Sequence, residues 1–249
     1  MEEQNFSNQV AIVTGGTRGI GAAIATALLS RGATVIATYA GNASAAESFR
    51  QALPEDCRAR CKTRAFDVAD VQAVEAFFQE FDGLHERLDI LVNCAGIRKD
   101  GVLAMLPEES WDRVLSVNLD GAYHVAKQAV LRMLPRRSGR IVFVTSPMGR
   151  LGWTGQANYA ASKAGLVGLC RSLAKEVARR GITCNCVSPG FIDTEFIGNL
   201  TEEQKKEYAQ LVPCRRFGRA EEVADGVLYL LSSGAAYVTG TVLEISGGL

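Results

Sequence analysis

The chain has 249 residues, and its 27 lysines and arginines balance 27 aspartates and glutamates, so the formal net charge at pH 7 is zero. This length suits one large α/β domain or two small ones, and the balanced charge gives no electrostatic reason to expect nucleic acid or an acidic membrane as a partner. The first residues, MEEQNFSNQ, are acidic and polar, and no run of about 18 apolar residues occurs, so we expect neither a signal peptide nor a membrane span.

Short apolar runs alternate with longer stretches of helical periodicity along the whole chain. In chain order, the predicted elements are strand Val10–Thr14, helix Gly19–Ser30, strand Thr34–Tyr39, helix Ala43–Leu53, a weaker strand Lys62–Val68, helix Val71–Leu84, strand Asp89–Asn93, helix Pro107–Met133, strand Arg140–Thr145, helix Asn158–Arg180, strand Ile182–Ser188, helix Ala220–Leu231 and strand Thr241–Ser246. Most of these strands are continuously apolar, as buried parallel strands are. The alternation predicts one domain, residues 1–249, built as a Rossmann-type doubly wound parallel β-sheet flanked by helices on both faces.

One polar segment interrupts this alternation. Residues at about 190–213 follow the sixth predicted strand, and this is the expected place for an insertion that could act as a mobile lid. Within the segment, TEEQ, which begins at Thr201, is a capping-box signature for the start of a helix.

The exit of the first predicted strand is rich in glycine. In a sheet of this kind, ligands bind at the carboxyl ends of the strands. Here the strand runs into TGGTRGIG, in which Gly15, Gly19 and Gly21 have the spacing G-x-x-x-G-x-G. Glycines at such a site permit a tight turn and close backbone approach, and the N-terminus of the following helix faces a pyrophosphate. The position between the first strand and the first helix therefore favours nucleotide binding over an ordinary turn.

The exit of the second strand bears on which dinucleotide is bound. NAD sites usually carry an acidic residue about 20 residues beyond the glycines, where it holds the ribose 2′-hydroxyl. No acidic residue occurs here between Thr34 and Ala46. Arg18, inside the glycine loop, offers a guanidinium that could grip a 2′-phosphate. These features favour NADP, and a solvated loop arginine is the alternative interpretation of Arg18.

Four further polar residues are candidates for chemistry. The fourth strand runs into NCAGI and the fifth into TSPMG, so Ser146 lies just past a strand end, and VNLDG places Asn118 in the long predicted helix. Tyr159 and Lys163 are four residues apart, which puts them on one helical face. Taken singly, each has a structural interpretation: a surface pair, a polar group within a helix, or a turn serine before proline. Only the set of four favours catalysis.

The cysteines give no sign of a metal site. The chain has seven cysteines and two histidines. The close pairs Cys57/Cys61 and Cys184/Cys186 have no second pair or histidine nearby to complete a zinc site. We therefore expect no metal, and reduced, partly buried thiols in a cytoplasmic protein.

Together these motifs resemble the short-chain dehydrogenase/reductase family. The resemblance rests on TGGTRGIG, NCAG, Asn118, Ser146, Tyr159-x-x-x-Lys163 and SPGFIDT, and it runs from about Val10 to the end of the chain. Each motif alone is common, but their joint occurrence in this order is specific. The resemblance implies an oxidoreductase that interconverts an alcohol and a carbonyl group.

The resemblance also implies a role for each catalytic residue. Tyr159 would be the general acid that protonates a carbonyl oxygen as hydride reaches the carbon. A free phenol has a pKa of about 10, so it needs a nearby cation to ionise readily. Lys163 would supply that cation and also bind the nicotinamide ribose. Ser146 would polarise the substrate carbonyl, and Asn118 would hold a water that links Lys163 to solvent.

A cofactor-binding set follows from the same resemblance. Asp67, after the third strand, would receive the adenine amino group. The full set is Gly15, Thr17, Arg18, Gly19, Ile20, Gly21, Tyr39, Asp67, Val68, Asn93, Ala95, Gly96, Tyr159, Lys163, Pro189, Gly190, Ile192 and Thr194.

Within the family, the chain is most similar to the 3-oxoacyl-acyl-carrier-protein reductases of fatty acid synthesis, through QANYAASKAGLVGL, RGIT, SPGFIDT and RFGRAEEVADGVLYLLS. This similarity implies a cytoplasmic homotetramer that reduces 3-oxoacyl thioesters with NADPH. Arg137 and Arg180 match the residues through which these reductases contact the acidic carrier protein. The alternative is structural, because Arg180 ends a predicted helix, where a cation complements the dipole, and Arg137 belongs to a solvated basic turn.

Three departures from the pattern leave the acyl-chain preference open. Cys94 replaces the second asparagine of the usual N-N-A-G, Pro147 stands where small β-branched residues are common, and Trp153 is bulky for its loop. Two other functions also stay open. One is reduction of an acyl-CoA such as acetoacetyl-CoA, or of another carbonyl compound. The other is a non-catalytic NADP-binding sensor, which we would expect to lack Tyr159 or Lys163.

Overall fold

The sheet has the predicted parallel, doubly wound form. The structure, a computed structural model, describes residues 5–194 and 201–249. These residues form one seven-stranded parallel sheet in the order β3-β2-β1-β4-β5-β6-β7. The strands are β1 (Val10–Thr14), β2 (Thr34–Tyr39), β3 (Cys61–Ala65), β4 (Ile90–Asn93), β5 (Gly139–Val144), β6 (Ile182–Pro189) and β7 (Val242–Ile245).

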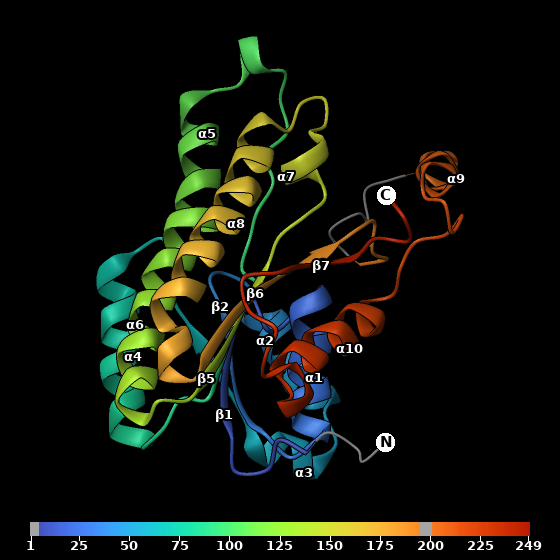
Figure 1. Cartoon of the computed structure of the whole chain (residues 1–249). Coiled ribbons are helices and arrows are strands. Elements are labelled where there is room, and N and C mark those ends of the chain that lie inside the picture. Colours follow the sequence, from blue (N-terminus) through green and yellow to red (C-terminus); the bar gives the residue numbers. More distant parts are fainter. Residues whose placement is uncertain (1–4, 195–200) are drawn as a thin grey trace.

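Helices cover both faces of this sheet (Figure 1). On one face lie α1 (Gly19–Ser30), α2 (Ala43–Ala52), α3 (Glu55–Arg60) and α10 (Ala220–Leu231), and on the other lie α4 (Val71–Leu84), α6 (Gly121–Arg136) and α8 (Ala157–Val177). Strand side chains alternate between the two cores, as the two-residue period requires. In β1, for example, Ala11 and Val13 pack on the side of α1 and α10, whereas Ile12 packs on the side of α4, α6 and α8.

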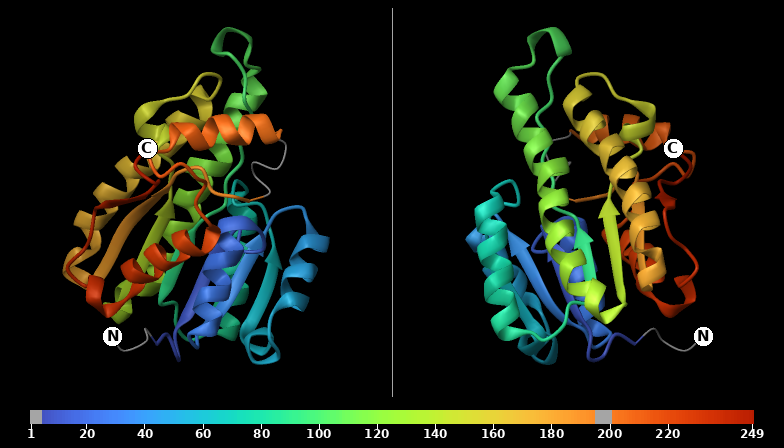
Figure 2. Two further views of the ribbon diagram at one scale, coloured as in Figure 1. Left: turned by 90° about the vertical axis from the view of Figure 1, so that its right-hand side faces the viewer. Right: turned by 60° about the vertical axis from the view of Figure 1, so that its left-hand side comes forward.

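The strand order reverses between β1 and β4, and this positions the ligand site. The chain builds outward from β1 through β2 to β3, and β4 then pairs with the other side of β1. Thr14 and Asn93 are paired in register, so β1 and β4 end at the same level. Ligands of open α/β sheets bind in the crevice at such a reversal. The views in Figure 2 show α5 (Glu108–Leu115), α7 (Met148–Leu151) and α9 (Glu202–Leu211) gathered beyond that edge of the sheet.

The long helix predicted for residues 107–133 is divided in the structure. It consists of α5, a π-helical turn η2 (Ser116–Asp120) and α6, which continues to Arg136 with Pro135 in its last turn. Arg137 then takes the left-handed conformation, with φ of 52°, and ends the helix. Apolar periodicity cannot reveal a single π turn, because the helix axis and its buried face continue through it.

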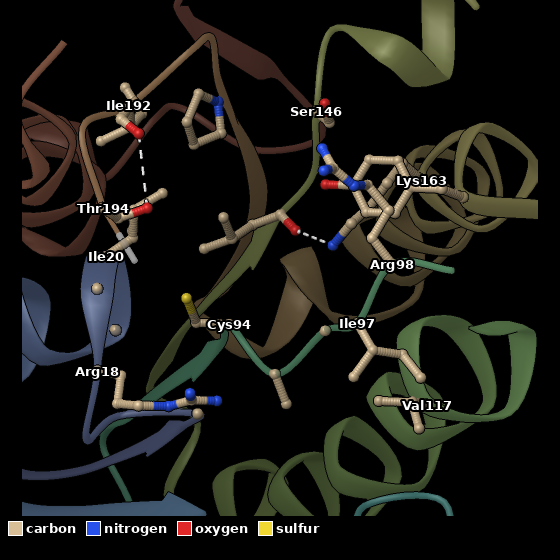
Figure 3. Close-up of a pocket in the computed structure, with 18 of the residues that line it drawn as sticks. Arg18, Ile20, Cys94, Ile97, Arg98, Val117, Ser146, Lys163, Ile192 and Thr194 are labelled. Atoms are coloured by element: carbon tan, nitrogen blue, oxygen red, sulfur yellow. Dashed lines mark hydrogen bonds between the residues drawn. The ribbon is translucent and has the colours of Figure 1, made fainter. Parts of the chain in front are cut away.

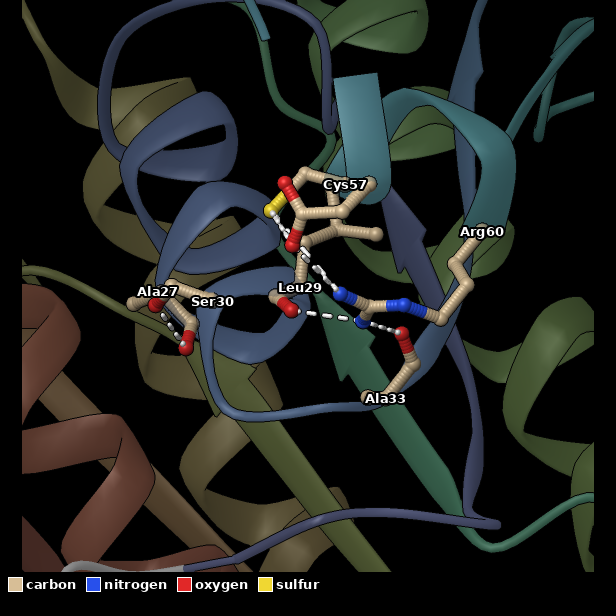
Figure 4. Close-up of polar contacts among 7 residues, drawn as sticks. Ala27, Leu29, Ser30, Ala33, Cys57 and Arg60 are labelled. Atoms are coloured by element: carbon tan, nitrogen blue, oxygen red, sulfur yellow. Dashed lines mark hydrogen bonds and ion pairs between the residues drawn. The ribbon is translucent and has the colours of Figure 1, made fainter. Parts of the chain in front are cut away.

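Some short helices were not predicted from the sequence. The predicted helix 43–53 ends at Ala52, and α3 follows it at once. Arg60 anchors α3, because its Nη1 donates hydrogen bonds to the carbonyl oxygens of Leu29 (2.6 Å), in the last turn of α1, and of Ala33 (3.0 Å), just before β2 (Figure 4). α7 and the 3₁₀ turns η1 (Leu103–Met105), η3 (Ala178–Arg180) and η5 (Ser233–Ala235) were also unpredicted, since they are too short to show a period.

The segment predicted to be an insertion contains α9. Its N-terminus carries the predicted capping box, in which the Thr201 side chain accepts from the Gln204 N–H and the Gln204 side chain accepts from the Thr201 N–H. Part of this segment, 195–200, lies outside the described residues. Within the described ranges, no helix combines the length and the apolar character needed to cross a membrane.

Candidate active site

A cavity of about 670 Å³ opens at the carboxyl ends of β1, β2, β4, β5 and β6 (Figure 3). It gathers most of the predicted site residues, namely Gly15, Thr17, Arg18, Gly19, Ile20, Gly21, Tyr39, Asp67, Val68, Ala95, Gly96, Ser146, Tyr159, Lys163, Pro189, Gly190, Ile192 and Thr194. Asn93 and Asn118 do not line it, and both are buried behind its wall. A cavity of this size is typical of cofactor sites.

The glycine loop has the shape that a phosphate cradle requires. Gly15 has φ of +62°, a region that favours glycine. A Cβ on Gly21 would lie 2.1 Å from the carbonyl oxygen of Gly15, so a side chain there would force the loop apart. The loop therefore lies flat against the start of α1, whose N-terminus carries the positive end of the helix dipole. These residues fit a pyrophosphate.

At the end of β2, the cavity is lined by uncharged residues and by Arg18 of the glycine loop. Arg18 and Tyr39 line the cavity together with Ala40, Gly41 and Asn42. Among the described residues that line the cavity, the carboxylates are Asp67 and Asp100, and neither belongs to the end of β2. Asp67 lies beside the cavity after β3, where its carboxylate accepts from the Ala69 N–H (3.0 Å) and from Arg113 (2.5 Å).

Thr14 and Asn93 are buried polar residues at the ends of β1 and β4, next to the cavity. Thr14 Oγ1 accepts hydrogen bonds from the N–H groups of Cys94 and Ala95, both at 3.1 Å, and so fixes the loop after β4. The sequence analysis did not identify Thr14, although its signal was a polar residue at the end of an apolar strand. Asn93 is buried, and its Nδ2 has no hydrogen-bond partner among the described residues.

Asn118 lies in the π turn η2 and is fully buried. Its Oδ1 accepts from the Ile97 N–H (2.8 Å), and its Nδ2 donates to the Ile97 carbonyl oxygen (3.0 Å) and to Ser162 Oγ (3.1 Å). The Asn118 side chain therefore satisfies both backbone groups of Ile97, as the backbone of a neighbouring strand would. A Cβ on Gly96 would meet both Asn118 Oδ1 and Lys163 Nζ at 3.4 Å, so Asn118 reaches the surroundings of the lysine.

Ser146, Tyr159 and Lys163 line the cavity together. Figure 3 shows Ser146 and Lys163 on the same side of it. Ser146 follows β5, and its Oγ accepts from the Met148 N–H at 3.3 Å. Lys163 Nζ donates to the Val144 carbonyl oxygen at 2.9 Å and lies 5.6 Å from the centroid of the Tyr159 ring. Helix α8 thus brings the phenol and the ammonium to the same wall, one turn apart.

Burial shifts the pKa values of Tyr159 and Lys163 in opposite directions. It raises the pKa of Tyr159 to about 12, against the hydrogen bond from Ser146 and the positive charge of Arg98, which lower it. Burial lowers the pKa of Lys163 to about 8. At neutral pH the phenol therefore keeps its proton, and most of the lysine carries its charge, which is the state that proton donation requires.

Four aromatic side chains that line the cavity form a cluster. The Trp153 ring lies 6.0 Å, edge to face, from the rings of both Phe191 and Tyr208. Phe191 and Tyr208 stack at 5.2 Å, and Phe217 lies 6.1 Å from Phe191. The sequence analysis identified only Trp153. Phe191 and Phe217 lie within the motifs SPGFIDT and RFGRAEEVADGVLYLLS but received no role there, and Tyr208 comes from α9. The cluster gives the cavity an apolar wall suited to a hydrocarbon chain.

All three departures from the family pattern lie at the cavity. Cys94, Pro147 and Trp153 line it. Burial raises the pKa of the Cys94 thiol to about 11, so this cysteine is neutral at physiological pH. Within the described residues, no three histidine, cysteine, aspartate or glutamate side chains come together as a metal site would require.

Arg137 and Arg180 lie together at the other end of the sheet. Arg137 follows α6, and its Nη2 donates to the Arg179 carbonyl oxygen at 2.9 Å, while Arg180 ends η3 after α8. Tyr159 lies near the start of α8, which has 21 residues. At 1.5 Å per residue, the two ends of this helix are about 30 Å apart. The two arginines therefore do not reach the cavity of their own chain.

Comparison with known proteins places the chain among oxidoreductases of similar length and fold. A family model described as enoyl-(acyl carrier protein) reductase matches residues 15–249. The 3-oxoacyl-acyl-carrier-protein reductase of Escherichia coli K12 is 41% identical over 98% of both chains. That of Haemophilus influenzae is 43% identical over 98% of this chain and 99% of its own. A crystal structure from Agrobacterium tumefaciens, assigned as a gluconate dehydrogenase, has a TM-score of 0.92 and 29% identity, covering 98% of this chain and 96% of the other.

Proposed function

Because this chain belongs to the short-chain dehydrogenase/reductase family, we propose that it reduces a 3-oxoacyl thioester on acyl carrier protein to the 3-hydroxyacyl thioester with NADPH. The observation that carries the proposal is the wall formed by Ser146, Tyr159 and Lys163 beside a cavity with a glycine cradle. Identity above 40% over 98% of the chain to 3-oxoacyl-acyl-carrier-protein reductases supports the reaction and a place in fatty acid synthesis. A cytoplasmic location is part of the same proposal.

The dinucleotide would be held along the exits of the first strands and of β6. The glycine loop would bind the pyrophosphate. Arg18 and Tyr39 would bind the 2′-phosphorylated ribose, and Asp67 would bind the adenine. A carboxylate has four acceptor positions, so Asp67 can serve Arg113 and the adenine together. The remaining contacts would come from Thr17, Gly19, Ile20, Val68, Asn93, Ala95, Gly96, Pro189, Gly190, Ile192 and Thr194. When bound, NADPH supplies the hydride.

The residues of the chain would provide the proton and the polarisation. Ser146 donates a hydrogen bond to the substrate carbonyl oxygen, and Tyr159 gives its proton to the same oxygen. The tyrosinate that forms is stabilised by the Lys163 ammonium on the same helical turn. Lys163 returns a proton to the phenol and recovers one from solvent through a water held near Asn118. The aromatic cluster and α9, in the lid-like segment, would exclude bulk water from the acyl chain.

We predict that reduction is lost in the alkaline range because Lys163 loses its charge there. Its folded pKa of about 8 lies below its ordinary value, so the ammonium is present at neutral pH and disappears as the pH rises through that value. Tyr159 stays protonated to about pH 12 and cannot cause the loss. The value of kcat/KM for NADPH should therefore fall by about tenfold per pH unit above pH 8. A flat profile from pH 6 to 10 would exclude this role for Lys163.

Arg18 should decide the choice of cofactor. We predict that the unmodified protein binds NADPH in preference to NADH, since a 2′-phosphate can form charge-assisted hydrogen bonds with a guanidinium. Arg18→Ala should weaken NADPH binding by about 10- to 100-fold and leave NADH binding nearly unchanged. Fluorescence titration of both cofactors measures this, with Arg31→Ala, at the far end of α1, as the control. Equal affinity of the unmodified protein for the two cofactors would contradict the assignment.

Carrier docking on Arg137 and Arg180 requires more than one copy of the chain. Both residues lie at the amino ends of β5 and β6, whereas the cavity opens at the carboxyl ends. A carrier bound to the arginines of one copy would therefore deliver its thioester to the cavity of another. The proposed homotetramer provides such neighbouring copies, and light scattering that reports a stable monomer would exclude this arrangement.

We predict that Arg137→Glu combined with Arg180→Glu raises KM for acetoacetyl-acyl-carrier protein by about tenfold or more, because the carrier is acidic. KM for acetoacetyl-N-acetylcysteamine should not change, since the cavity is untouched. The effect should shrink with salt as the Debye length falls to about 8 Å at physiological ionic strength. Lys62→Glu, on edge strand β3, is the charge-reversal control. Equal losses on both substrates would assign the arginines a structural role and favour acyl-CoA as the substrate.

A further inference from the structure

The loop after β4 carries a cation on the substrate side of the cavity that the catalytic set does not include. Arg98 lines the cavity, and Figure 3 shows its side chain extending from this loop toward Ser146. About one third of the side chain is exposed. Its positive charge lowers the pKa of Tyr159, which agrees with a guanidinium close to the phenol.

The segment around Arg98 is fixed on both sides. The preceding residue, Ile97, is held by Asn118 through both its N–H and its carbonyl oxygen, at 2.8 and 3.0 Å. The following residue, Lys99, has its carbonyl oxygen bound by Asn158 Nδ2 at 3.0 Å. The Gly101 N–H donates to the Gly155 carbonyl oxygen at 2.8 Å. These contacts join the segment to η2 and to the start of α8, so the base of Arg98 is positioned relative to Tyr159.

Asp100 partly compensates the charge of Arg98. One of its carboxylate oxygens lies 3.2 Å from Arg98 Nε, and the other accepts from Gln156 Nε2 at 3.3 Å. A guanidinium has five N–H donors in a planar fork, so it can serve a carboxylate and a substrate oxygen at once. Since Asp100 already supplies a negative charge, the site suits a neutral, polarised oxygen better than a second anion.

We infer that Arg98 binds the thioester carbonyl oxygen of the substrate and thereby selects 3-oxoacyl thioesters over isolated ketones. The inference rests on the proposed function and names a specificity residue for it. In a 3-oxoacyl thioester, the ketone that is reduced and the thioester carbonyl are separated by one carbon atom. When Ser146 and Tyr159 hold the ketone oxygen, the second oxygen lies a short distance away, on a side of the cavity that Arg98 lines.

The test compares two substrates that differ in this one oxygen. Acetoacetyl-N-acetylcysteamine carries the thioester carbonyl, and S-(3-oxobutyl)-N-acetylcysteamine has a methylene group in its place. Arg98→Ala should lower kcat/KM for the thioester by about 10- to 100-fold, the range expected for a lost hydrogen bond to a charged group. For the thioether, Arg98→Ala should change kcat/KM by less than about threefold. The Ki of the thioether as a competitive inhibitor of thioester reduction should change equally little. Arg98→Lys should restore part of the loss, because an ammonium still donates but lacks the planar fork.

Two controls isolate the side chain. Lys99→Ala removes an exposed cation one residue away and outside the cavity, and it should leave both substrates unaffected. The NADPH dissociation constant and the melting temperature of Arg98→Ala show whether the variant is folded.

Each outcome decides between named possibilities. Equal losses on both substrates would mean that Arg98 acts through Tyr159, and no loss on either would mean that it does not contact the substrate; both overturn the inference. A larger loss on free acetoacetate than on the thioester would assign Arg98 to an anionic group and also overturn it. If the unmodified protein reduced the thioether but not the thioester, the proposed function itself would fail, and if it reduced both with equal efficiency, only the role of Arg98 would fail.

Discussion

Tyr159→Phe is expected to lower kcat for 3-oxoacyl thioester reduction by about 10²–10⁴-fold, the usual value of general acid catalysis. The substitution removes the hydroxyl that donates the proton and keeps the ring, so the packing of α8 at the cavity wall is retained. NADPH binding should stay within about twofold of the unmodified protein, since no cofactor contact depends on the proton. Stopped-flow measurement of NADPH oxidation, together with a fluorescence titration, separates the two quantities.

The control for this variant is Tyr123→Phe, which removes a hydroxyl from a half-exposed tyrosine on α6. It should leave kcat unchanged. Near-normal turnover by Tyr159→Phe would mean that another group, or water, protonates the carbonyl oxygen, and the proposed mechanism would be wrong.

Lys163→Met is expected to lower both kcat and the affinity for NADPH. It keeps much of the side-chain volume and removes the charge that stabilises the tyrosinate. The loss in kcat should be about 10²–10³-fold, as for removal of one preorganised electrostatic group. NADPH affinity should fall by about tenfold or more, because a charged hydrogen bond to the ribose is also lost.

This combination distinguishes Lys163 from Tyr159, whose loss should affect the rate alone. Lys175→Met, three turns further along α8 and exposed, is the matched control. A variant at Lys163 that lost activity with unchanged NADPH affinity would argue against a ribose contact and leave only its effect on the phenol.

The sheet and the catalytic wall could be predicted because their signals are local. Continuously apolar runs locate the buried strands, and residues just past those runs, such as Ser146, necessarily meet at the carboxyl edge of a parallel sheet. The spacing of Tyr159 and Lys163 follows from one helical turn. The comparisons confirm the predicted family and fold class.

Features that depend on tertiary contacts could not be predicted in this way. The π turn at Asn118 is stabilised by hydrogen bonds to Ile97, 21 residues away. Arg98 and Phe217 reach the cavity from loops, and Tyr208 reaches it from the polar helix α9, so apolar periodicity does not identify these three residues. The position of Arg137 and Arg180 opposite the cavity, in contrast, could have been predicted, because both residues closely precede predicted strands and ligands bind at the other ends of those strands.

The most direct test of the proposed function is NADPH oxidation with acetoacetyl-acyl-carrier protein, with the product identified by mass spectrometry. The proposal predicts rapid consumption of NADPH, slower consumption of NADH, and a 3-hydroxybutyryl thioester as product. The matching family model is described as an enoyl reductase, which would reduce a carbon–carbon double bond. The unsaturated crotonyl thioester is therefore the matched control, and we expect that it is not reduced. Reduction of the crotonyl thioester, or NADPH binding without turnover of any 3-oxoacyl thioester, would contradict the account.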